Sequence, residues 1–110
     1  MDTKTALASL NALAHDGRLT IFRLLVRHAP DGLYAGEIAE RLDMKTNTLS
    51  ANLTVLAGAG LVENAREGRN IRYRANVVQM RDLLSFLFQD CCGGSPEACR
   101  PLLETLVCDC

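Results

Sequence analysis

Three cysteines near the end of the chain have the type and the spacing to bind a soft ion. Cys91 and Cys92 are adjacent, a Gly-Gly pair follows them, and a short loop leads to Cys99. Glycine frees the backbone, so the three sulfur atoms can converge on one small ion. Thiolates select soft metals and metalloids, and trivalent arsenic or antimony forms three bonds. The triplet, with no histidine nearby, therefore predicts a site for As(III) or Sb(III).

The same thiols allow two other kinds of chemistry. A structural zinc site normally takes four ligands, and Cys108 or Cys110 would complete such a set. Clustered thiols also oxidise readily beside a basic residue, and Arg100 follows Cys99 directly. A redox switch and a zinc-stabilised module therefore stay open at this point, as does the part that Cys108 and Cys110 play.

The composition of the chain limits the class of protein. Its 110 residues are 48% hydrophobic and 23% charged, which predicts one folded domain. The sequence has no apolar run of membrane-spanning length, and its first residues lack the basic start and cleavage site of a signal peptide. We expect a cytoplasmic protein, where thiols stay reduced and a disulfide framework is disfavoured. Because no catalytic constellation is present, we do not expect an enzyme.

Positive charge is concentrated in one segment. The stretch REGRNIRYR, residues 66–74, holds four arginines and one glutamate, although the net charge of the chain is −1. A basic patch on a near-neutral domain is typical of a site-specific nucleic-acid binder. On charge alone, the alternative is a solvated hairpin whose arginines serve solubility.

The spacing of apolar residues predicts the elements that position these sites. The helical period predicts helices over 3–14, 15–29, 35–43 and 46–58, alternation predicts a β-hairpin over 61–76, and a strongly apolar helix follows over 77–92. In the second helix Asp16 is the expected N-cap, and the predicted core residues are Leu19, Phe22, Leu25 and Val26. A final helix over 95–110 is also expected. The 77–92 helix is too apolar to be half exposed on a monomer, so it needs a partner surface.

This order of elements predicts a mainly α fold with a β-hairpin wing, a winged helix-turn-helix. Helix 46–58 would enter the DNA major groove while the wing approaches phosphates or the minor groove. Opposite its leucine stripe the helix carries short, polar, uncharged side chains, which suit close approach to base edges; Asn52 lies nearer the core edge. The predicted DNA-contacting residues are Lys45, Thr46, Asn47, Thr48, Ser50 and Asn52 in and beside the helix, and Arg66, Arg69, Asn70 and Arg72 in the wing.

Three segments carry a resemblance to a known family. The stretches are LNALAHDGRLTIFRLL, GEIAERLDMKTNTLSANLTVLAGAGLV and REGRNIRYRAN. Together they resemble the winged-helix repressors of the ArsR/SmtB family, and the similarity runs from about residue 6 to residue 92. The resemblance implies a homodimer paired through its first and fifth helices, with a DNA-binding and dimerisation domain over 1–92 and a cysteine-rich, inducer-binding tail over 93–110. It also implies an operator that is an imperfect inverted repeat and an inducer that lowers DNA affinity.

Two ligand sites of that family are missing from this sequence. GEIAERLD, residues 36–43, has no Cys-x-Cys pair, and NVVQMRDLLSFLFQD, residues 76–90, has no histidine. The chain therefore resembles the arsenic-responsive subgroup with its thiols moved to Cys91, Cys92 and Cys99. The expectation is a repressor that leaves its operator when As(III) or Sb(III) binds this triplet. The alternative is a thiol redox sensor, or a zinc-stabilised regulator or interaction module, that uses the same cysteines.

Overall fold

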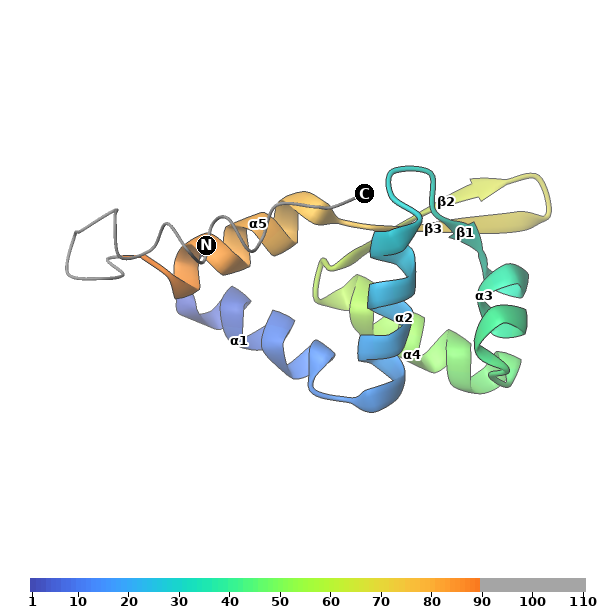
Figure 1. Cartoon of the computed structure of the whole chain (residues 1–110), viewed down its shortest axis with the longest axis horizontal. Helices are drawn as coiled ribbons and strands as arrows, with labels where there is room; N and C mark the ends of the chain where they lie inside the picture. Colours follow the sequence, from blue (N-terminus) through green and yellow to red (C-terminus); the bar gives the residue numbers. More distant parts are fainter. Residues whose placement is uncertain (90–110) are drawn as a thin grey trace.

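The computed structural model describes residues 1–89 and shows a helical molecule with a small sheet at one end (Figure 1). The predicted mainly α fold with a β-hairpin wing is confirmed. In chain order the elements are α1 (Thr3–Leu13), α2 (Asp16–Arg27), β1 (Leu33–Tyr34), α3 (Ala35–Leu42), α4 (Thr46–Gly58), β2 (Val62–Glu67), β3 (Asn70–Ala75) and α5 (Val77–Leu87). The predicted helix over 95–110 lies outside the described residues.

The start of α2 differs from the sequence-based expectation. His15, and not Asp16, is its N-cap, because the ring Nδ1 of His15 accepts the Arg18 backbone N–H at 3.4 Å. Asp16 is the first helical residue instead. A carboxylate there still interacts favourably with the positive end of the helix dipole.

The buried face of α2 is also rotated from the predicted one. Phe22 and Leu25 are buried as expected, but Leu19 and Val26 are each 43% exposed. Ile21 and Leu24 take their places in the core. The sequence could not make this choice, because α2 is apolar around much of its circumference and its neighbours decide which residues are covered.

The core lies around α2, which packs against α1, α3, α4 and β3. The predicted leucine stripe of α4 faces this core. Fully burying one such side chain contributes about 1.5–3 kcal/mol, so these contacts hold α4 firmly. The core residues are Ala12, Ile21, Phe22, Leu24, Leu25, Leu33, Ile38, Leu49, Leu53, Leu56, Leu61 and Val62.

The sheet is antiparallel and has the order β1-β3-β2. β2 and β3 form the predicted hairpin, with Gly68 at a φ of 63° in its turn. β1 was not predicted, because two residues are too short to show a period. Gly32 precedes it at a φ of 79°, and a Cβ there would collide with the Tyr73 carbonyl oxygen. Glycine is therefore needed for β1 to approach β3.

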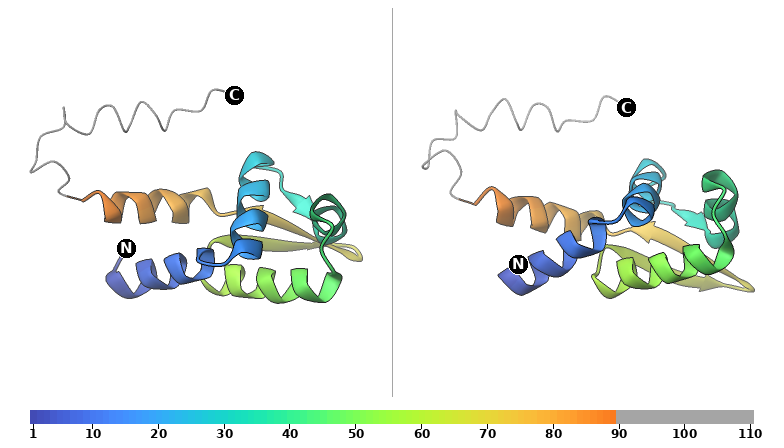
Figure 2. Two further views of the ribbon diagram at one scale, coloured as in Figure 1. Left: turned by 60° about the horizontal axis from the view of Figure 1, so that its bottom comes forward. Right: turned by 90° about the horizontal axis from the view of Figure 1, so that it is seen from below.

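The helices α1 and α5 lie side by side, away from the sheet, in both views of Figure 2. They expose several large apolar side chains, and Leu83 is the one residue of α5 that is buried. In the described part of the chain α5 ends at Leu87, with Phe88 as its C-cap, earlier than the predicted residue 92. The exposed apolar residues are Leu7 and Leu10 of α1, Val77, Val78 and Leu87 of α5, and Phe88.

Candidate nucleic-acid interface

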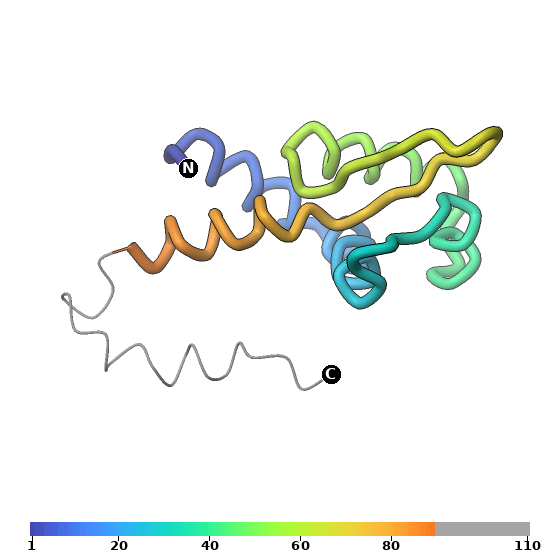
Figure 3. The backbone as a smooth tube through the Cα atoms, turned by 90° about the horizontal axis from the view of Figure 1, so that it is seen from above, coloured from blue at the N-terminus to red at the C-terminus, as the bar shows by residue number. Residues whose placement is uncertain are grey.

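The helix α4 has one buried and one exposed face. The tube view in Figure 3 shows α4 running beside the strands of the wing. Its exposed face carries the short polar side chains that the sequence predicted to read DNA. The Thr54 hydroxyl donates to the Ser50 carbonyl oxygen at 2.9 Å, so it is already used inside the helix. The predicted residues that are exposed here are Lys45, Thr46, Asn47, Thr48 and Ser50.

Asn52 does not share this exposed face. It is 6% exposed and lies on the leucine side of α4. Its Nδ2 atom packs against the first turn of α2, where a Cβ added to Gly17 would approach it to 3.0 Å. This burial corrects the prediction that placed Asn52 among the DNA-contacting residues. The helical period put it at the core edge, and the packing of α2 closed that edge.

The two faces of the wing carry different residues. Directly opposed residues of an antiparallel pair point to the same face. Arg66 opposes Ile71, while Arg72 opposes Ala65. Consecutive residues alternate between faces, so Arg66 shares the Ile71 face and Arg72 lies on the other. Arg69 lies in the turn between the strands and is exposed.

The Ile71 face of the wing is the one that meets the helix-turn-helix. A cavity of about 240 Å³ is lined by Ile71 and Tyr73 of β3, Gly36 of α3, and Thr46 and Ser50 of α4, among others. The wing and the exposed face of α4 therefore form one continuous surface. Arg66 and Arg69 lie on the side or the tip of the wing that extends this surface.

Arg72 is engaged within the protein. Its Nε donates to Glu67 Oε2 at 2.8 Å, and its Nη2 donates to Tyr34 Oη at 2.7 Å. Its guanidinium carbon lies 4.3 Å from the centre of the Tyr34 ring. The hydrogen bond from Arg72, followed by one from Tyr34, lowers the pKa of Glu67. The same bond to Glu67 is the main cause that raises the pKa of Arg72.

A polar junction connects α1 and α5 to the end of α4, and we define it as Ser9, Asn76 and Gln79. Asn76 accepts the Gln79 N–H at 3.1 Å and donates to the Gly60 carbonyl oxygen at 3.0 Å. The Gln79 side-chain amide donates to Ser9 Oγ at 3.2 Å and to the Ala59 carbonyl oxygen at 3.4 Å. Local spacing in the sequence does not reveal this junction, because it joins residues far apart in the chain.

The predicted thiol site belongs to the part of the chain that follows residue 89. Cys91, Cys92 and Cys99, like Cys108 and Cys110, lie outside the described residues. Within residues 1–89 no group of three or more His, Cys, Asp or Glu side chains could hold a metal ion.

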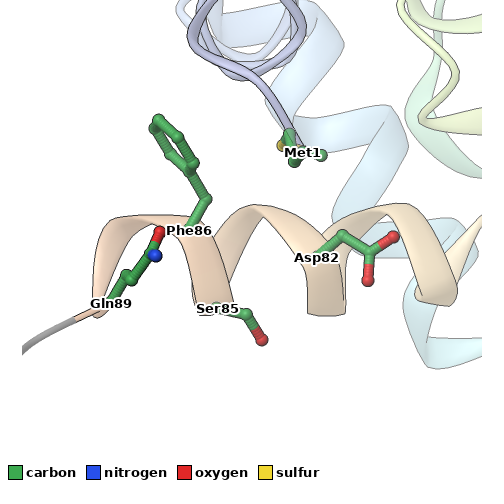
Figure 4. Close-up of a pocket in the computed structure, with 5 residues that line it drawn as sticks. All are labelled: Met1, Asp82, Ser85, Phe86 and Gln89. Atoms are coloured by element: carbon green, nitrogen blue, oxygen red, sulfur yellow. The ribbon is translucent and has the colours of Figure 1, made fainter.

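The last described turns of α5 border a hollow of about 290 Å³. Figure 4 shows Phe86 extending from α5 on the side where Met1 lies, with Asp82, Ser85 and Gln89 along the same helix.

In residues 1–89 no helix combines the length and the apolarity needed to cross a bilayer.

Comparisons with known proteins agree with this geometry. Residues 13–64 match the family model described as a helix-turn-helix domain. The biofilm growth-associated repressor of Agrobacterium fabrum (strain C58 / ATCC 33970) is 35% identical over 84 residues, which cover 76% of this chain and 69% of that protein.

Two solved structures are also similar. One is the homodimeric winged helix-turn-helix DNA-binding domain of a possible ArsR-family transcriptional regulator from Mycobacterium bovis (31% identity, TM-score 0.63, covering 79% of this chain and 81% of that one). This chain belongs to the ArsR family. The antimony-specific transcriptional repressor AntR is 32% identical, with a TM-score of 0.59 and coverage of 74% and 72% of the two chains.

Membership of the ArsR family gives the fold of this chain its role. The winged helix-turn-helix of this ArsR-family protein is a DNA-binding domain, and the chain is a transcriptional regulator and not an enzyme. The resemblance stated from the sequence is thus confirmed for the family. In a helix-turn-helix the second helix is the one that lies in the major groove, and in this chain that helix is α4.

Proposed function

We propose that this ArsR-family protein is a homodimeric repressor that leaves its operator when As(III) or Sb(III) binds Cys91, Cys92 and Cys99. The observation that carries the DNA-binding part is the continuous surface of α4 and wing. The observation that carries the inducer is the thiol triplet in the sequence a few residues beyond α5. Residues 1–92 would form the DNA-binding and dimerisation domain, and 93–110 the inducer-binding tail.

The DNA contacts divide by chemistry. Side chains such as Asn47 and Ser50 are short enough to bring α4 close to base edges and can both donate and accept. Lys45, at the N-terminus of α4, and the arginines of the wing supply the contacts to phosphate. The proposed set is Lys45, Thr46, Asn47, Thr48 and Ser50 beside and within α4, and Arg66, Arg69 and Asn70 in the wing.

Dimerisation is proposed from the exposed apolar side chains of α1 and α5. Val78 and Leu87 are 51% and 48% exposed in the single chain. A second copy would remove this surface from water, and the homodimeric relative from Mycobacterium bovis supports the same assembly. Two recognition helices related by a two-fold axis require an operator that is an imperfect inverted repeat.

Three thiolates match the three bonds that trivalent arsenic or antimony forms, and soft ligands favour such ions. The similar repressor AntR is specific for antimony, which supports a metalloid inducer. The count of five cysteines keeps one alternative, a thiol redox sensor or zinc-stabilised regulator that uses the same residues.

The polar junction offers a path from the thiols to DNA. A metalloid bound to the thiols beyond α5 would shift that helix, and Asn76 and Gln79 at its start are hydrogen-bonded to the end of α4. The operator-bound dimer would then be disfavoured. Effectors in such systems change affinity by about 5- to 150-fold.

The test is a titration of the reduced protein on a duplex that the wild-type protein selects from a random-sequence pool. Arsenite should weaken binding of the wild type within this range of about 5- to 150-fold. Cys92→Ser should abolish the response, and Cys108→Ser, outside the triplet, serves as the matched control. Equal release of wild type and Cys92→Ser would remove the triplet from the mechanism. Release by peroxide but not by arsenite would favour the redox sensor.

A further inference from the structure

The arginines of the wing have different surroundings, and Arg72 differs most. Its side chain is 28% exposed, whereas Arg66 and Arg69 are exposed residues. It lies on the face of β3 opposite to Ile71, which lines the cavity against α4. Arg72 therefore points away from the surface that α4 shares with the wing.

The donors of Arg72 are directed at groups of the protein. Glu67 and Tyr34 accept from Nε and Nη2 at 2.8 and 2.7 Å, and Nη1 lies 3.5 Å from the Asp31 carbonyl oxygen. A phosphate that replaced these partners would have to displace a charge-assisted hydrogen bond. It would also approach the negative charge of Glu67. Both effects oppose a direct contact between Arg72 and DNA.

Tyr34 connects this cluster to α3. It pairs with Arg72 across β1 and β3 and is also the N-cap residue of α3, the first helix of the helix-turn-helix. Its backbone N–H donates to Glu37 Oε1 at 2.9 Å, within the first turn of α3. Arg72 thus connects Glu67, at the end of β2 nearest the tip of the wing, to Tyr34, the N-cap residue of α3.

We propose that Arg72 is a positioning residue that fixes the wing relative to the helix-turn-helix through Glu67 and Tyr34, and does not itself bind DNA. It sets where Arg66 and Arg69 lie when α4 occupies the groove. This inference rests on the proposed function, because it assumes that the wing contacts operator DNA. It removes Arg72 from the DNA-contacting set predicted from the sequence and assigns it a different role.

The salt dependence of binding separates the two roles. The logarithm of the affinity falls linearly with the logarithm of the salt concentration, and each lost phosphate contact reduces the magnitude of this slope by about 0.9. The full-length reduced protein would be measured on the duplex that the wild type selects, with Arg69→Gln as the matched control. Because each protomer of the proposed dimer loses one contact, Arg69→Gln should reduce the magnitude of the slope by about 1.8. Arg72→Gln should leave the slope unchanged, because Arg66 and Arg69 still reach phosphate once the complex has formed. It should weaken binding about 2- to 30-fold, the range for residues that act without touching the ligand, because the freed wing must first be ordered.

Variants of the two partners give the sharper outcome. Tyr34→Phe and Glu67→Gln should both weaken binding, and Tyr34→Phe should add little to Arg72→Gln, because the interaction is already lost. Three results would overturn the proposal: a salt slope of smaller magnitude for Arg72→Gln, an unchanged DNA affinity of Arg72→Gln, or tighter DNA binding by Glu67→Gln. The last result would mean that Glu67 restrains an arginine that otherwise reaches phosphate. If Arg72→Gln does not fold, the two partner variants decide the question.

A measurement without DNA keeps this proposal separate from the proposed function. Amide hydrogen exchange of the free protein should be faster across the β1–β3 pairing and the wing in Arg72→Gln than in the wild type. Unchanged exchange would overturn the positioning role. If the wild type selects no sequence and Arg69→Gln has no effect, the proposed DNA contacts fail, while the exchange result still decides whether Arg72 holds the wing.

Discussion

The two ends of this molecule differ in how much apolar side-chain surface they leave exposed. At the DNA-reading end α2, α3, α4 and the sheet enclose a core in which Leu25, Ile38 and Leu56 are 0% exposed. At the pairing end α1 and α5 contact one another, yet Leu7 and Val77 are 55% and 52% exposed. The first end is completed by its own chain, and the second leaves large apolar side chains exposed, which is why we propose that a second copy covers them. The difference teaches that an apolar helix alone does not reveal whether its partner is internal or external.

The largest expected effect is a loss of stability, and it tests the end whose core is enclosed by α2, α3, α4 and the sheet. Leu25→Ala should lower the free energy of unfolding by about 2–5 kcal/mol, because it leaves a cavity in a fully packed core. Leu19→Ala, on the same helix but 43% exposed, is the matched control and should change stability far less. Urea denaturation at several protein concentrations measures both. Similar losses for the two variants would show that the core is not closed as described.

A backbone variant tests how the sheet joins that core. Gly32→Ala should cost about 1–3 kcal/mol for the unfavourable φ alone, and the collision of its Cβ with Tyr73 adds to this loss. Gly36→Ala is the control, because a Cβ there meets nothing within 4 Å. That variant should be neutral or stabilising by about 0.4–1 kcal/mol. Thermal unfolding of the two proteins compares them, and a stable Gly32→Ala would contradict the close approach of β1 to β3.

A charge introduced on the exposed apolar surface of α1 and α5 tests the other end of the molecule. Leu87→Asp should weaken dimerisation by about 2 kcal/mol or more, roughly thirtyfold, because a two-fold interface carries the change twice. Leu19→Asp introduces the same charge at the DNA-reading end, where the wild-type residue is 43% exposed, against 48% for Leu87. Sedimentation equilibrium over a range of concentrations reports the assembly. Dissociation by both variants, or by neither, would erase the distinction between the two ends.

The smallest effect concerns single bases. Asn47→Ala should cost about 1 kcal/mol, and this loss should fall on discrimination at one position of the operator. Asn52→Ala, on the buried side of α4, should instead lower the stability of the fold and leave base preference unchanged. Affinities for a set of singly substituted duplexes, together with the unfolding transitions, separate the outcomes. A change in base preference for Asn52→Ala would restore that residue to the DNA-contacting set.

The residue pattern was sufficient for the elements that have a clear period. The leucines of α4 and the alternation around Gly68 predicted the recognition helix and the wing with nearly correct bounds. The prediction failed where two helices meet, as at Asn52, because a residue at the edge of a helical face is covered or exposed by its neighbour. It also failed to find β1, since two residues carry no period.

The candidate site shows the same division. Residue type and the exposed face of α4 were enough to select the short polar side chains that suit a DNA groove. The pattern could not separate Arg66 from Arg72, because both are arginines in one basic segment. Their pairing partners separate them, since Ile71 places one toward α4 and Tyr34 holds the other away.

The sequence by itself determined the order of the helices and the hairpin, the family and the chemistry available to the thiols, because these depend on residue type and local spacing. Tertiary structure alone decided which face of α2 is buried, that Asn52 is covered, and that Arg72 binds Glu67 and Tyr34. The reason is physical: local spacing fixes the direction of a side chain relative to its own helix or strand. What that side chain meets depends on segments far away in the chain, which only folding brings together.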